Sequence, residues 1–132
     1  MKVFLDTNIF IRFFTEDSGD SFAKVSAIFE EIEGGTMRPY TSNVVLLEVG
    51  YVLSTFYKLE KHISIEYLNK IVQMRNITVV EKTDFKQALK IYAETNVKLA
   101  DILIALQVPK GVKLATLDKE FNKLKFVEKL EL

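Results

Sequence analysis

Cysteine is absent from this sequence, and histidine is nearly so. The 132 residues contain no cysteine and a single histidine, His62. Without cysteine the chain has no disulfide framework, no thiol nucleophile and no thiolate zinc site, so carboxylates are the only abundant ligands for a hard metal ion. This composition is consistent with a reducing, cytoplasmic environment.

An excess of charge of either sign is also missing. The 18 acidic residues balance the 18 basic residues, so the formal net charge is zero. The whole molecule therefore has no electrostatic attraction to nucleic acid or to an anionic membrane, and any polyanionic partner must be held locally. The longest stretch with a single charge, 39–57, contains too many polar residues to span a membrane. Because the charge of Asp6 comes too early for a signal peptide, we expect a soluble protein that is not secreted.

Proline and glycine are scarce, with two and five residues, and no repeat or linker divides the chain. We therefore expect a single domain over 1–132. Short apolar runs predict strands at 2–5, 37–40, 77–80 and 112–116, and a candidate fifth at 126–127. Helical spacing predicts helices at 8–14, 18–33, 43–57, from Ser64 to 72, after a cap at Thr83 or Asp84, at 99–108 and at 118–124. This order predicts a three-layer α/β/α fold with a central parallel sheet of four to five strands, whose functional sites lie at the carboxyl ends of the strands.

Three acidic residues interrupt stretches that otherwise carry no charge. They are Asp6, between Lys2 and Arg12, Glu48, between Arg38 and Lys58, and Asp101, between Lys98 and Lys110. Glu48 has apolar neighbours on nearly every side of its helix, so we expect it to be buried. A buried, ionised carboxylate must be paired, protonated or bound to a metal ion.

Each of these acids also has a purely structural interpretation. Asp6, Asp101 and Asp118 could cap or charge the first turn of a helix, and Glu48 could form an internal ion pair with a lysine or arginine. Taken together, however, Asp6 and Asp118 follow predicted parallel strands, and four acids at one edge of a sheet would repel one another unless divalent cations were bound. Oxygen ligands of this kind suit Mg²⁺ or Mn²⁺, which also bind phosphate oxygens, so the pattern indicates metal-assisted cleavage of phosphate esters.

Four segments in this order resemble the PIN domain family over nearly the whole chain. FLDTN at residues 4–8 resembles its first motif, and Glu48, in a helix that opens after Thr41 and Ser42, is similar to its second acid. ADILIA at residues 100–105 and TLDKEF at residues 116–121 resemble the motifs that carry the third and fourth acids. In length and order the chain resembles the VapC-like toxins of type II toxin-antitoxin systems.

The resemblance implies a function and a partner. It implies a ribonuclease that hydrolyses RNA at an acidic pocket with one or two Mg²⁺ or Mn²⁺ ions, and an antitoxin protein as partner. The implied metal ligands and catalytic residues are Asp6, Glu48, Asp101 and Asp118. Thr116 would orient Asp118 or a metal-bound water, and Asn8 would support the same cluster. With these four acids set aside, 18 basic residues face 14 acidic ones, so RNA binding is expected to depend on the metal.

Two features depart from the family pattern. The helix after Asp101 ends early, at 107–111, and Leu117 stands where a basic residue is frequent in the toxins. We therefore expect other basic residues to contact RNA, namely Arg12, Arg38, Lys110 and Lys113.

Other functions are also considered. An enzyme with an aspartyl nucleophile needs a second Asp where this chain has Asn8, and a receiver domain needs an acid in place of Thr7, so both are disfavoured. His62, in the polar segment 58–62, is interpreted as a surface residue, which disfavours a histidine-dependent ribonuclease. A PIN-domain nuclease of RNA processing and a non-catalytic PIN-like module that binds RNA or protein stay as alternatives.

Aromatic residues are more numerous on two predicted helices than one small sheet readily covers. They are Phe10, Phe13, Phe14, Tyr51, Phe56 and Tyr57. Either they fill the core, or some of them join two copies of the chain in a homodimer.

Overall fold

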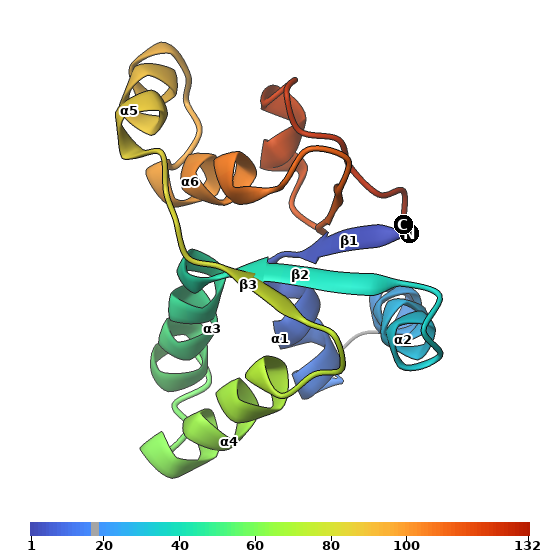
Figure 1. Cartoon of the computed structure of the whole chain (residues 1–132). Coiled ribbons are helices and arrows are strands. Elements are labelled where there is room, and N and C mark those ends of the chain that lie inside the picture. Colours follow the sequence, from blue (N-terminus) through green and yellow to red (C-terminus); the bar gives the residue numbers. More distant parts are fainter. Residues whose placement is uncertain (17–18) are drawn as a thin grey trace.

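A parallel sheet forms the centre of the molecule. The computed structural model describes residues 1–16 and 19–132 (Figure 1). In sheet order β3-β2-β1-β4, the strands are β3 (Thr78–Val80), β2 (Arg38–Ser42), β1 (Lys2–Leu5) and β4 (Lys113–Ala115). Phe4 of β1 pairs with Tyr40 on one side and Leu114 on the other. Val3 to Leu5 are fully buried, as an apolar strand covered on both faces requires.

Helices cover both faces of this sheet. In chain order they are α1 (Thr7–Thr15), α2 (Gly19–Glu33), α3 (Asn43–Thr55), α4 (Lys61–Val72), α5 (Phe85–Glu94), α6 (Leu99–Gln107) and the short 3₁₀ helix η1 (Lys119–Lys123). Figure 1 shows α1 to α4 below the sheet and α5 and α6 above it. The predicted three-layer α/β/α fold is confirmed. The predicted start of α2 at Ser18 lies outside the described residues.

An aromatic cluster joins α1, α2 and α4 below the sheet. The rings of Phe13 and Phe29 are stacked with centroids 4.1 Å apart, and those of Phe14 and Tyr67 lie 4.6 Å apart. Phe10 is fully buried in the same region. Burial of one such side chain contributes about 1.5–3 kcal/mol, so this cluster fixes α1, which begins directly after Asp6, against its neighbours.

One predicted helix start and the candidate fifth strand are wrong. Helix α4 begins at Lys61, because the backbone N–H groups of Ile63 and Ser64 already donate to the Glu60 carbonyl, and Ser64 is buried inside the helix rather than capping it. Residues 126–127 lie in a turn, and the chain instead meets β4 at a single bridge between Lys129 and Leu114. Phe126 is exposed there, so an apolar pair alone did not distinguish a turn from a strand.

Asp84 rather than Thr83 caps α5. The backbone N–H of Gln87 donates to Asp84 Oδ1 at 3.1 Å. Within residues 1–16 and 19–132, no helix combines the length and the hydropathy needed to cross a bilayer.

Candidate functional site

Asp6 lies where β1 ends and α1 begins, and its carboxylate is tied in place. Only 3% of the residue is exposed. Oδ1 accepts from the backbone N–H of Thr7 at 2.7 Å, and Oδ2 accepts from Thr116 Oγ1 at 2.7 Å and from Asn8 Nδ2 at 3.1 Å. Asp6 is thus the N-cap of α1, as one interpretation of the sequence held, and it also faces two polar side chains of the predicted site.

Thr116 and Asn8 form a frame that joins the ends of β1 and β4. Asn8 Nδ2 donates to Thr116 Oγ1 at 3.2 Å, and Asn8 Oδ1 accepts from the backbone N–H of Leu117 at 2.9 Å. Thr116 Oγ1 also accepts from the backbone N–H of Asp118 at 3.0 Å. Asp118 is half-buried and caps η1 through the N–H of Glu120 at 2.9 Å. The frame therefore positions Asp6 and Asp118 relative to each other.

Glu48 is half-buried rather than buried, which corrects the expectation from sequence. The apolar residues that suggested a buried helix include Leu47 and Tyr51, which are 75% and 67% exposed, so α3 turns part of its apolar surface outward. Within the described residues Glu48 forms no ion pair, and its Oε1 accepts instead from Thr7 Oγ1 at 2.7 Å. Thr7 thereby ties the second acid to the start of α1.

Asp101 occupies the first turn of α6 and is 7% exposed. In contrast to Asp6, it accepts no hydrogen bond from the described part of the chain. Burial, followed by the negative charges of Asp118, Asp6 and Glu48, raises its pKa to about 7, although Lys98 opposes this rise. Burial likewise raises the pKa of Asp6 to about 6, against the lowering effect of the hydrogen bonds from Thr116 and Thr7.

The donor set of this site fits a hard divalent cation. Four carboxylates influence one another electrostatically, two have raised pKa values, and none has a basic partner in an ion pair among the described residues. Over residues 1–16 and 19–132, no three acidic side chains converge closely enough to hold one ion. Shared binding of a cation therefore requires side-chain movement, and Asp101 is the acid that no hydrogen bond restrains.

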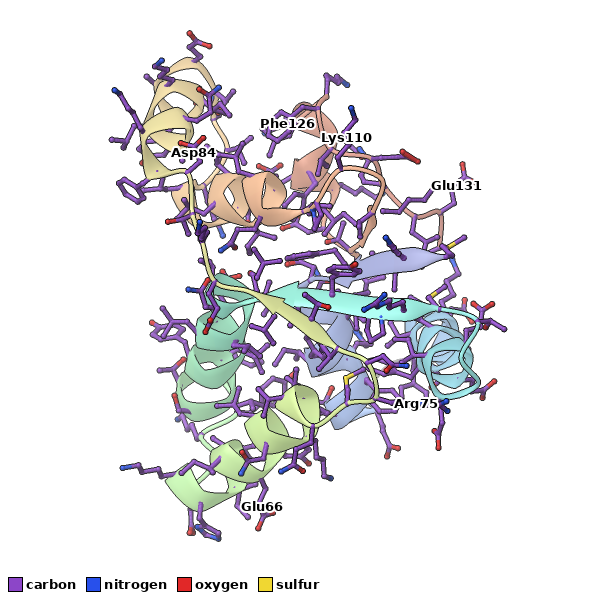
Figure 2. All side chains as sticks on the ribbon, in the orientation of Figure 1. Glu66, Arg75, Asp84, Lys110, Phe126 and Glu131 are labelled. Carbon is purple, nitrogen blue, oxygen red and sulfur yellow. The ribbon has the colours of Figure 1, made fainter. Side chains whose placement is uncertain are left out.

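Three of the four basic residues expected to contact RNA lie away from the acids. Arg38 pairs with Lys2, at the end of β1 opposite Asp6. Lys113 opens β4 and lies 3.8 Å from Glu128 in an ion pair. Lys110 lies on the loop after α6, beside Phe126 (Figure 2).

Arg12 lies elsewhere, in the last turn of α1, the helix whose first turn follows Asp6. His62 is exposed, 3.4 Å from Glu60, as expected for a surface residue.

Thr7 and Lys98 were not among the predicted site residues. Thr7 forms part of the DTN segment, but its hydroxyl group reaches a residue 41 positions away, a contact that no local pattern indicates. Lys98 immediately precedes α6, and its position in the sequence three residues before Asp101 was the only available signal.

The aromatic residues considered for a homodimer divide into two groups. Phe10 is buried, and Phe13, Phe14 and Tyr57 are half-buried. Tyr51 and Phe56 are 67% and 74% exposed. The core interpretation therefore holds for α1, and a homodimer stays a prediction that now rests on the outer face of α3.

The fold has three layers around one parallel sheet, and its acids lie after β1 and β4, in α3 and at the start of α6. This combination defines a class of α/β proteins with an acidic site at the carboxyl ends of the strands. A family model for the PIN domain matches residues 3–127. The chain belongs to the PIN domain family, whose members are generally nucleases.

Solved structures show the same fold at low sequence identity. VapBC2 from Rickettsia felis, bound to a DNA fragment from its promoter, matches with a TM-score of 0.70 and 15% identity over 98% of each chain. VapBC-1 from nontypeable Haemophilus influenzae matches at 0.71 and 18%, over 99% of this chain and 98% of that one. FitAcB from Neisseria gonorrhoeae matches at 0.63 and 16%, over 99% and 97%. Comparison with curated protein sequences gives no match.

Proposed function

We propose that this protein is a metal-dependent endoribonuclease that hydrolyses RNA phosphodiester bonds at the acidic carboxyl edge of its sheet. The observation that carries the proposal is the pair of buried acids Asp6 and Asp101, whose pKa values of about 6 and about 7 reflect burial close to other carboxylates. Such an arrangement is costly unless a cation compensates for it, so a site of this kind is more typical of function than of stability.

Asp6, Glu48, Asp101 and Asp118 would hold Mg²⁺ or Mn²⁺ directly or through water. A bound ion of this kind supplies a water of lowered pKa for attack and offsets negative charge on the phosphate. Thr116 and Asn8 orient Asp6 through hydrogen bonds to Oδ2, and Thr7 orients Glu48 through its hydroxyl group. These neutral donors leave the negative charge of the acids in place, which cation binding requires.

Two amide substitutions test this assignment. We expect Asp6→Asn and Asp101→Asn each to abolish Mg²⁺- or Mn²⁺-dependent cleavage of RNA, while circular dichroism shows a folded protein. Glu66→Gln is the matched control, because it removes one negative charge from the exposed face of α4 (Figure 2). Full cleavage in EDTA, or in either amide variant, would contradict the mechanism.

A toxin role in a toxin-antitoxin pair, acting in the cytoplasm, is the second part of the proposal. It is supported by the resemblance of the four motifs to VapC-like toxins and by the similarity in fold to two VapBC complexes. We expect expression of the protein alone to arrest growth and a small protein encoded beside it to relieve the arrest. Harmless expression of an active ribonuclease would favour RNA processing, and a protein that binds RNA without cleaving it would favour a non-catalytic module.

A further inference from the structure

A surface hollow adjoins the acidic site on the side of Asp118. Its wall includes residues 116–119, and it is bounded by the start of α2 and by the C-terminal segment that begins at Lys129. Lys24 Nζ donates to the backbone oxygen of Leu132 at 3.3 Å, which holds that segment against α2. The start of α2, which lies far away in sequence, thus meets residues 116–119 and the C-terminal segment beside a proposed metal ligand.

Three of the five charged side chains that line this hollow are lysines. Each of its three parts contributes one lysine, namely Lys24, Lys119 and Lys129. Besides Asp118, the acidic side chain in the wall is Glu131, which Figure 2 labels. Among residues 1–16 and 19–132, neither Lys119 nor Lys129 takes part in an ion pair. Their ammonium groups are therefore available to an external anion.

Asn122 adds a neutral donor to the same wall. It is exposed, and its side-chain amide can donate to a phosphate or ribose oxygen. A phosphate backbone carries one negative charge per nucleotide, so separate ammonium groups and amide donors along a hollow suit several phosphates better than one compact ligand.

We propose that this lysine-lined hollow receives the phosphates of the RNA strand beside the bond to be cleaved, with Lys119 and Lys129 as positioning residues. This inference rests on the proposed ribonuclease function and deepens it by giving the path of the substrate. It replaces Arg38, Lys110 and Lys113, which lie away from the acids, as the expected contacts.

A pair of double variants tests the path. Lys119→Gln/Lys129→Gln removes two charges from the hollow, and Lys90→Gln/Lys125→Gln removes two exposed charges elsewhere. Cleavage of single-stranded RNA in Mn²⁺ is measured at several salt concentrations. For single strands each lost phosphate contact should lower the salt slope by about 0.7, which corresponds to roughly fivefold weaker binding at 0.1 M salt.

The hollow variant should therefore lose about 25-fold in kcat/KM at 0.1 M salt, through KM, with a slope reduced by about 1.4 and kcat nearly unchanged. The control variant should stay close to the unmodified protein. If the unmodified protein is active and the two variants behave equally, the RNA-binding role of the hollow is overturned and the ribonuclease function is not. If the unmodified protein is inactive, the proposed ribonuclease function itself is overturned. If the hollow variant cleaves RNA normally but no longer binds a protein partner, the proposed RNA path would also be overturned. The hollow would then be assigned to the binding of an acidic peptide.

Discussion

Asp6 and Asp101 are two buried acids of the same candidate site, but the described residues around them donate hydrogen bonds only to the carboxylate of Asp6. Asp6 accepts three hydrogen bonds, from the backbone of Thr7 and from the side chains of Thr116 and Asn8. Asp101 accepts none from the described residues, and its pKa of about 7 is the higher of the two. One acid is held in a rigid frame, and the other is restrained only by its place in the first turn of α6.

This contrast separates two tasks within one site. Hydrogen bonds to an ionised carboxylate stabilise its charge and fix its oxygens, so Asp6 is ready to bind a cation without further ordering. Asp101 has neither compensation and stays strained by its acidic neighbours when it is ionised. We therefore interpret Asp6 as the fixed ligand and Asp101 as the adjustable one, whose ionised form is compensated only when a cation binds.

The largest expected effect comes from Asp101→Asn. It should reduce metal-dependent cleavage by more than about 100-fold, because it removes a proposed metal ligand rather than a supporting contact. The same change should stabilise the metal-free protein at pH 8.

The sign of this stability effect follows from the raised pKa. Folded Asp101 binds its proton more tightly than the unfolded chain does, so stability falls as the pH rises from about 4 through 7, and at pH 8 the folded protein bears a cost of about 2–4 kcal/mol. The amide variant does not bear this cost. Urea unfolding in EDTA at pH 8 and pH 4.5 should show the gain at pH 8 and little of it at pH 4.5, whereas a loss at pH 8 would contradict the strain assigned to Asp101.

Thr116→Val should have the next largest effect, because it breaks the frame around Asp6. It removes the donor to Asp6 Oδ2 and the acceptor for Asn8 and for the N–H of Asp118. We expect activity to fall by about 10–100-fold and the free energy of unfolding to fall by about 1–3 kcal/mol. Thr116→Ser keeps the hydroxyl group and should recover most of both losses. Equal defects in the two variants would show that the hydroxyl group does not carry the role of Thr116 and would contradict the frame.

Thr7→Val should have the smallest effect of these changes. Glu48 is half-buried and loses only one hydrogen bond, from Thr7 Oγ1. We expect a loss of about tenfold or less in kcat/KM, with stability changed by about 1 kcal/mol or less. A loss as large as that of Asp101→Asn would show that Glu48 needs the same rigid support as Asp6.

The sequence predicted the places of the four acids on strands and helices more reliably than it predicted the contacts around them. Strands that end at Asp6 and near Asp118 follow from apolar runs, and their convergence follows from the rules of parallel sheets. The hydrogen bond from the Thr7 hydroxyl to Glu48 and the gathering of lysines around Asp118 could not be predicted, because they arise from contacts between distant segments. The burial of Glu48 was predicted wrongly because apolar residues such as Leu47 and Tyr51 are exposed on the same helix.

The central claim is that Asp6 and Asp101 share a bound divalent cation. The number of protons released when the cation binds tests this claim most directly. With pKa values of about 6 and about 7, the two acids hold together about one proton at pH 6.5 and about 0.1 at pH 8, and a cation must displace it. Calorimetric titration with Mn²⁺ in two buffers of different ionisation enthalpy measures this number. We predict release of about one proton per protein at pH 6.5, falling to about 0.2 in Asp101→Asn, which retains Asp6 alone. The absence of Mn²⁺ binding, or equal release by both proteins, would contradict the claim.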